Sequence, residues 1–169
     1  MGIPIPQEPK TNIRFGLDSL RIQTPGKDRR ARRNYSLSYN EYFNEFIRFE
    51  LLGMIALDTE KKSRSVDIRQ DYYGLFPGAS LVYHNLFRYS TTIGLGLWHQ
   101  QTTSKIINDS EWHSTYSFAL LNRYNMDYAI TEAIELGLYL GFYYRFEYDM
   151  LDWSYGLSIN YNLDFQLQE

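Results

Sequence analysis

The sequence predicts an all-β fold, an antiparallel up-and-down transmembrane β-barrel, and three observations carry this prediction. Large apolar residues alternate with small or polar ones along eight segments of the chain. Strict alternation is typical of β-strands, whose successive side chains point to opposite faces. The residues between the bulky ones are mainly Gly, Ser, Asn and Thr in the clearest segments. Those segments are also longer than the roughly 9–11 residues that a tilted strand needs to span a membrane.

The alternation is clearest in the last two segments. Large residues occupy every even position of the first, Ile134, Leu136, Leu138, Leu140, Phe142, Tyr144, Phe146 and Tyr148. They occupy every odd position of the second, Trp153, Tyr155, Leu157, Ile159, Tyr161, Leu163, Phe165 and Leu167. Residues 149–152 lie between the two segments, which predicts a tight hairpin there.

Six earlier segments repeat the pattern less regularly. They cover residues 13–22, 35–39, 47–57, 66–72, 89–97 and 112–120. In the first, the phase slips between Leu17 and Leu20, which predicts a β-bulge. The stretch from Leu75 to Phe87 is the least regular and holds either a long turn around Pro77 or an extra hairpin. We therefore expect eight strands, with ten as the alternative.

The bulky set of side chains must face outward if these strands close into a barrel. An eight-stranded barrel has room inside only for compact side chains, and the bulky set would overfill it. The bulky set then faces lipid and the polar set faces the lumen. The alternative is a soluble, lipocalin-like ligand carrier with an apolar core. Against it, the polar face of the last two segments contains no Lys, the residue that water-facing sheets commonly display.

Composition limits the remaining possibilities. The length of 169 residues suits one domain, with residues 12–169 forming the barrel and residues 1–11, which contain three Pro, forming a lead-in. A net charge of −3 excludes a generally basic nucleic-acid binder, and no nucleic-acid partner is expected. The absence of Cys excludes a disulfide scaffold and a thiolate metal site. Seven aromatic residues near strand ends predict interfacial girdles, namely Tyr35, Tyr39, Tyr89, Trp98, Trp112, Trp153 and Tyr161.

On these features the chain resembles the small bacterial outer-membrane β-barrels of the OmpA and OmpX kind. The resemblance covers about Asn12 to Leu167 and rests on the alternation, the strand number and the absence of Cys. It implies a multi-pass barrel in the outer membrane of a Gram-negative bacterium. It also implies that both termini, and with them the lead-in, lie on the periplasmic side. The odd-numbered hairpins then face the cell exterior.

Three of those external hairpins form a basic rim, as we name it here. Its members are Lys27, Arg29, Arg30, Arg32, Arg33, Lys61, Lys62, Arg64 and Lys105, nine of the seventeen basic residues. Arg in particular suits bidentate contact with phosphate, and lipopolysaccharide phosphates lie at this level of the outer membrane. The rim therefore predicts binding of lipopolysaccharide or an acidic polymer. The alternative is a set of solvated charged loops without a ligand.

A second charged set has the parity of the lumen-facing side chains. It comprises Arg14, Asp18, Arg48, Glu50, Asp67, Arg69, Asp71, Arg123, Glu135, Arg145, Glu147 and Asp164. Both signs are present, so we expect a paired interior network, because an unpaired buried charge is costly. A polar gate or a narrow channel is the functional alternative, which the plugged lumen of an eight-stranded barrel disfavours.

Enzyme chemistry would need a base beside a nucleophile at the membrane edge. The weak candidates are His99 and His113, which flank the third external loop with opposite facing. Ser114 faces away from His113, so these two form no dyad, although a cross-strand partner stays open. We expect no cofactor and no metal site. We expect a non-enzymatic membrane anchor and binding protein, which contacts lipopolysaccharide through the rim or a protein through the N-terminal segment or external loops. A lipid-modifying acyl hydrolase or transferase is the alternative.

Overall fold

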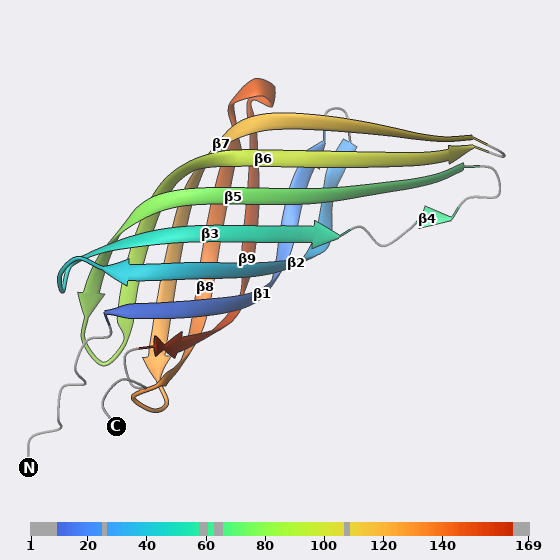
Figure 1. The fold of residues 1–169 in the computed structure, drawn as a ribbon. Helices are drawn as coiled ribbons and strands as arrows, with labels where there is room; N and C mark the ends of the chain where they lie inside the picture. Colours follow the sequence, from blue (N-terminus) through green and yellow to red (C-terminus); the bar gives the residue numbers. More distant parts are fainter. Residues whose placement is uncertain (1–9, 25–26, 58–60, 63–65, 107–108, 164–169) are drawn as a thin grey trace, which may run out of the picture.

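The computed structural model describes residues 10–24, 27–57, 61–62, 66–106 and 109–163. These residues form one sheet (Figure 1) with strands β1 Thr11–Thr24, β2 Lys27–Tyr42, β3 Ile47–Leu57, β4 Lys61–Lys62, β5 Val66–His84, β6 Arg88–Ile106, β7 Asp109–Ala129, β8 Ile134–Arg145 and β9 Met150–Asn162. A 3-10 helix, η1, covers Phe146–Tyr148. No helix in this part of the chain is long and apolar enough to cross a membrane.

The sheet closes into a barrel of eight antiparallel strands. β1 pairs with β9 along a seam that runs from Asn12 opposite Asn162 to Arg21 opposite Trp153. β3 pairs directly with β5, and the two-residue β4 pairs with β5 beside the ring. The predicted eight-stranded up-and-down barrel is confirmed. The ten-stranded alternative is wrong, because the uncertain stretch from Leu75 continues β5 without interruption to His84.

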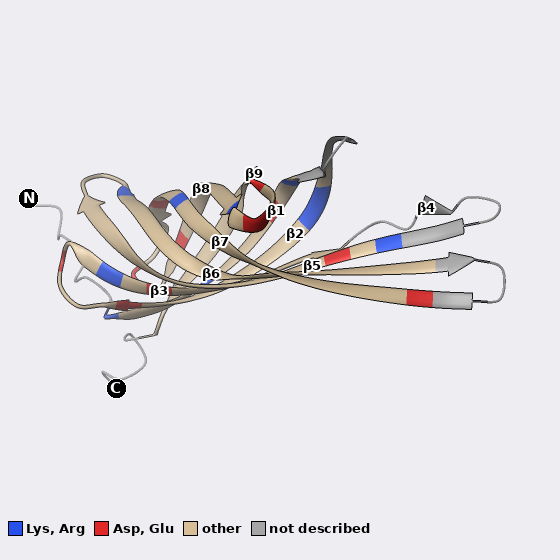
Figure 2. Cartoon of the chain, turned by 90° about the horizontal axis from the view of Figure 1, so that it is seen from above, with Lys and Arg blue, Asp and Glu red and all other residues tan. Residues whose placement is uncertain are grey.

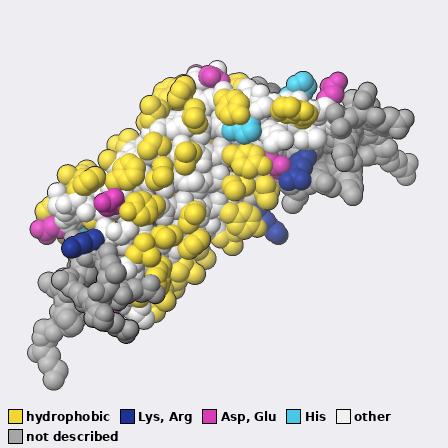
Figure 3. Space-filling view, viewed as in Figure 1, with side chains coloured by type: hydrophobic (Ala, Val, Ile, Leu, Met, Phe, Trp, Pro, Cys, Tyr) yellow, Lys and Arg dark blue, Asp and Glu magenta, His cyan; other side chains and the backbone are white. Residues whose placement is uncertain are grey.

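Side chains alternate between an apolar outer wall and the lumen. β3 lies between β2 and β5. Its Leu52 and Met54 side chains are buried in the lumen, whereas its Ile55 side chain is 44% exposed on the outer wall. Leu157 in β9 is 64% exposed, and Figure 3 shows hydrophobic side chains spread over the visible face of the barrel. A wall of this kind suits lipid and not water. The expectation that the bulky set faces outward is confirmed, and a soluble carrier with an apolar core is not what the chain forms.

Three neighbouring strands extend beyond the ring at one end. β5, β6 and β7 have 19, 19 and 21 residues, whereas β8 and β9 have 12 and 13. Pairing of β5 with β3 begins at Tyr72, and pairing of β7 with β8 begins at Ala119. We call the part beyond those pairings, Val66–Asp71, Gln101–Ile106 and Asp109–Phe118, the protruding sheet. Figures 1 and 2 show it running out from the barrel at the end away from the termini.

Three local expectations are wrong. Alternation suggested a strand to Tyr148, but β8 ends at Arg145 and η1 follows, with Asp149 in the left-handed region at φ 50°. The predicted bulge between Leu17 and Leu20 is absent, because β1 pairs with β2 in constant register there and Leu20 and Ile22 simply point into the lumen. The register of β1 shifts only between Ile22 and Thr24.

The third wrong expectation concerns Trp98, which was predicted to lie in an interfacial girdle. Its side chain is 1% exposed and lies inside the barrel.

The closing seam predicts a sensitive glycine. A Cβ on Gly156 would lie 2.4 Å from the Leu17 carbonyl oxygen and 2.4 Å from the Asp18 Cβ, so β1 would have to move. We expect Gly156→Ala to destabilise the barrel by roughly 1–3 kcal/mol, as overpacking does. Urea unfolding in detergent micelles, followed by circular dichroism and heat-dependent gel mobility, measures this. Gly53→Ala is the matched control, because its Cβ would meet only the Leu37 carbonyl at 3.7 Å. Equal stability of the two variants would contradict the packing argument.

Candidate functional site

The half of the lumen nearer the termini holds a charged network centred on Glu50. Its Oε1 accepts a hydrogen bond from Arg123 Nη1 at 3.1 Å, and its Oε2 accepts one from Arg48 Nη2 at 3.3 Å. The Thr92 hydroxyl donates to Oε2 at 2.7 Å. All four residues are at most 1% exposed. One buried carboxylate is therefore held between two guanidinium groups, which avoids an unpaired charge in the lumen.

Further ion pairs join neighbouring or more distant strands inside the barrel. Their partners are Arg14 and Asp127 at 2.5 Å, Arg88 and Glu135 at 2.6 Å, and Arg145 and Asp152 at 2.7 Å. Arg14 also donates from Nε to Asn160 Oδ1 at 2.6 Å. The structure thus buries eight members of the predicted interior set, Arg14, Asp18, Arg48, Glu50, Asp71, Arg123, Glu135 and Arg145.

Two members of the interior set are misplaced. Arg69 lies in the protruding sheet with its side chain 47% exposed, where it pairs with Asp71 at 2.7 Å. Glu147 is exposed on η1. Asp67 and Asp164 carry side chains outside the described set. The errors share a cause, since the alternation of β5 and β8 continues past the point where the ring and its lumen end.

Three partners were missed by sequence reasoning. Asp127 continues the polar parity of β7 beyond the segment assigned to that strand, so extending the segment to Ala129 would have found it. Asp152 was assigned to a hairpin but lies in β9. Arg88 is the first residue of β6, one position before the segment recognised.

The other half of the lumen is closed by an aromatic cluster. Trp98 lies with its ring centroid 5.4 Å from Tyr143, 6.0 Å from Tyr72 and 6.3 Å from Phe76. Tilted and edge-to-face pairs at such distances are favourable aromatic contacts. The other members of this apolar cluster are Leu20, Ile22, Leu52, Met54, Ala56, Ala119 and Leu121. The described lumen is therefore filled by side chains from one half to the other.

The basic rim is only partly described. Arg32 is a correction, because it is 6% exposed, donates to the Gln70 carbonyl at 2.6 Å and stacks over the Tyr72 ring at 4.7 Å. Arg33 is exposed on the outer wall. The remaining side chains, Lys27, Arg29, Arg30, Lys61, Lys62, Arg64 and Lys105, lie outside the described set. Sequence reasoning missed Arg21, which lies 5.4 Å over the Trp153 ring on the same wall.

The histidines adopt different surroundings. His99 Nε2 lies 2.6 Å from Ser114 Oγ across β6 and β7, and its ring stacks on Tyr116 at 4.4 Å and on Tyr73 at 5.6 Å. His113 is 77% exposed and 3.8 Å from Glu111. The two histidines form no pair, and the described residues contain no cluster suited to a metal ion. His99 and Ser114 are the cross-strand combination that the sequence left open.

Comparisons with known proteins agree with this fold. No family model matches the chain, and no curated protein matches it either. Among solved structures, Ail of Yersinia pestis is similar with a TM-score of 0.70 and 16% identity over 92% of this chain and 99% of that one. Neisserial surface protein A is similar with a TM-score of 0.69 and 10% identity over 91% and 97%.

A third similar structure is the N-terminal barrel domain of OprF from Pseudomonas aeruginosa, with a TM-score of 0.57 and 15% identity over 91% and 98%. The chain therefore has the fold of small bacterial outer-membrane barrels, as its sequence pattern predicted. Its apolar outer wall is suited to the lipid of an outer membrane.

The Glu50 network predicts a large stability effect. Glu50→Ala leaves Arg48 and Arg123 buried without their shared carboxylate. We therefore expect the free energy of unfolding to fall by about 3–5 kcal/mol. Glu45→Ala removes an exposed carboxylate from the β2–β3 turn and serves as the control, with an expected change within about 0.5 kcal/mol. Urea titration in micelles measures both. A Glu50→Ala barrel as stable as the control would show that the network adds nothing.

Proposed function

We propose that the protein is a non-enzymatic, non-conducting anchor in the outer membrane that binds an external protein through the protruding sheet. The observation that carries the proposal is an open sheet edge. In β7, residues 111–117 pair with β6 on one side, and the described residues place no strand on the other. An exposed strand edge is a ready template for pairing with another chain.

The outer face of the same edge is aromatic. Trp112 is 68% exposed and Tyr116 is 62% exposed, beside the stacked His99. Exposed aromatic side chains of this kind are the usual anchors of protein interfaces. A partner strand added to β7 would meet main-chain hydrogen-bonding groups and these side chains together.

The filled lumen supports an anchor and disfavours a channel. The Trp98 cluster and the Glu50 network occupy the two halves of the lumen with buried side chains. An eight-stranded barrel filled in this way leaves no aqueous path. The barrel then holds the protruding sheet in place without exchanging solutes.

Contact of the basic rim with lipopolysaccharide phosphates stays part of the proposal. Arg33 is the rim member whose exposed side chain supports it. The similar protein Ail was crystallised with a heparin analogue, sucrose octasulfate, which is a polyanion. A rim rich in Arg and Lys suits such anionic groups.

A second candidate function rests on the short contact between His99 and Ser114. A hydroxyl beside an imidazole is the arrangement of an activated nucleophile. Among the described residues, however, no third group orients the other imidazole nitrogen. The arrangement therefore supports an acyl hydrolase less well than an interface.

Binding through the edge predicts a specific loss. Replacing Trp112 and Tyr116 together by Lys removes the aromatic anchors and puts charge on the open edge. We expect binding of the nanodisc-embedded chain to an array of secreted and extracellular-matrix proteins to fall about tenfold or more. Bio-layer interferometry on each positive protein measures the fall.

The control for that experiment is Thr102→Lys, which adds charge to the central strand β6 on the polar face of the sheet. It should bind like the unaltered chain. An array without any bound protein, or equal binding by both variants, would contradict the proposed function.

Ser114→Ala tests the second candidate. If the pair hydrolyses lipid esters, release of fatty acid from lipopolysaccharide or phospholipid will fall at least about 10³-fold in the variant, as expected for a lost nucleophile. We expect instead that neither chain releases fatty acid above the rate of empty nanodiscs. Release of fatty acid that depends on Ser114 would show that the protein is an enzyme and would contradict the proposal of a non-enzymatic anchor.

A further inference from the structure

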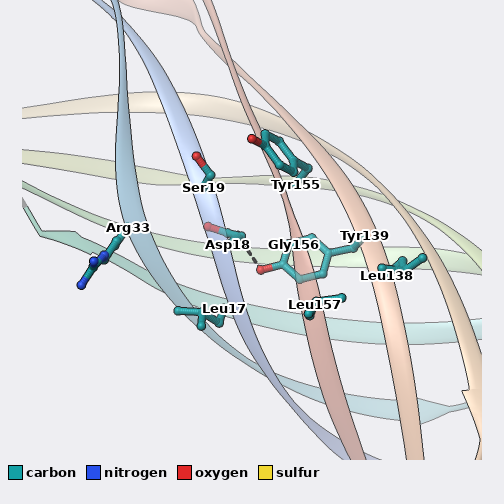
Figure 4. A pocket seen from close by; sticks show the side chains of 9 residues that line it. All are labelled: Leu17, Asp18, Ser19, Arg33, Leu138, Tyr139, Tyr155, Gly156 and Leu157. Atoms are coloured by element: carbon teal, nitrogen blue, oxygen red, sulfur yellow. Dashed lines mark hydrogen bonds between the residues drawn. The ribbon is translucent and has the colours of Figure 1, made fainter.

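The outer wall contains a groove where β1 and β9 meet, with β8 and β2 on either side. Its cavity volume is about 450 Å³. Leu17, Leu138 and Leu157 form its apolar sides, and Gly156 lies at its floor (Figure 4). The three leucines are 57%, 49% and 64% exposed on the lipid-facing wall. The groove therefore opens toward the bilayer and not toward the lumen.

The floor of the groove is sealed from the lumen. Asp18, a member of the interior set, and Tyr139 lie behind Gly156 and are 7% and 5% exposed. The Tyr139 hydroxyl donates to Asp18 Oδ2 at 2.5 Å, and Asn34 Nδ2 donates to the same oxygen at 3.0 Å. An occupant would thus meet apolar sides and a closed floor, as an acyl chain requires.

Arg33 of β2 borders this groove. Its neighbours on the outward row of β2 are Tyr35 and Leu37, both 50% exposed to lipid. No carboxylate of the described residues forms an ion pair with Arg33. An Arg on a lipid-facing wall is costly without an anion, and bilayer lipids supply phosphate at the interface, which guanidinium binds in a bidentate manner.

The groove lies at the level where phosphate is available. Ser19 is opposite Arg33 in the β1–β2 pairing, and Arg21, one outward position further along, lies over Trp153. Trp153 stacks on Tyr155 at 5.5 Å, and such aromatic pairs mark the headgroup zone. The hydroxyls of Ser19 and Tyr155 line the groove on the same side as this zone, where they can bind sugar hydroxyls.

We infer that this groove binds one acyl chain of a phosphorylated outer-leaflet glycolipid, lipopolysaccharide, with Arg33 on its phosphate and Ser19 and Tyr155 toward its sugar. The inference rests on the proposed contact of the rim with lipopolysaccharide and gives that contact a defined place. It does not depend on the protein partner of the protruding sheet.

The test counts bound lipid by native mass spectrometry of the whole barrel released from micelles. The probes are lipid A and, separately, phosphatidylglycerol. Arg33→Gln removes the phosphate contact, and Leu157→Trp fills the groove with the charge kept. We expect each to weaken lipid A binding about tenfold or more, the usual scale for a lost charged hydrogen bond. Their controls are Lys10→Gln, an exposed cation before β1 that belongs neither to the rim nor to the groove, and Leu95→Trp, the same substitution on the lipid-facing side of β6.

Each outcome decides a separate claim. Loss in both test variants, with controls and heat-dependent gel mobility unchanged, supports the groove. Lipid A binding to the unaltered chain that neither test variant weakens would overturn the groove and leave the rim proposal standing. No lipid A binding to the unaltered chain would overturn both. Phosphatidylglycerol bound as tightly and with the same dependence on Arg33 and Leu157 would overturn the glycolipid assignment.

Discussion

Closure of the strand ring is the constraint on which the rest of this structure depends. A bilayer offers no water to backbone N–H and C=O groups, so each strand must have a neighbour on both sides through the membrane. The pairing of β1 with β9 meets this requirement, and it brings the strands so close at Gly156 that a Cβ has no room. Closure also divides the side chains into two sets. Apolar residues such as Leu157 must cover the outside, and the narrow inside must be filled without stranding a charge.

The two halves of the lumen solve the filling problem differently. Near the termini, Glu50 lies between two guanidinium groups, and Arg14 pairs with Asp127, so polar side chains of several strands are fixed against each other. In the half of the lumen nearer the protruding sheet, Trp98 and its aromatic neighbours fill the space and exclude water instead. Both solutions use contacts between strands far apart in the sequence. The result is a barrel whose interior is filled by side chains that fix its strands against one another.

Much of this architecture could be predicted from alternation alone, because period-two patterning coincides with the pleat of a strand that separates lipid from lumen. The Glu50 network follows from parity in this way. The predictions that were wrong have physical causes. Parity does not reveal where a strand leaves the ring, so Arg69 and Glu147 were placed in a lumen that no longer exists at their level. Residue size misled for Leu20 and Trp98, since large apolar side chains are accepted inside where the opposite wall is small or complementary. The contact of His99 with Ser114 depends on strand register, which one sequence does not give.

Unequal strand length gives the barrel a tall side and a low side. β5, β6 and β7 rise on one side of the ring, and β8, β9 and β1 form the opposite, lower side, with β8 and β9 joined by the short η1 turn. The groove beside Arg33 lies on the lower side, where a strand wall of ordinary height leaves lipid headgroups free to approach. The open edge of β7 lies on the tall side, which carries Trp112 beyond the last ring pairing at Ala119. The two proposed sites therefore do not compete for space, and one chain can use both at once.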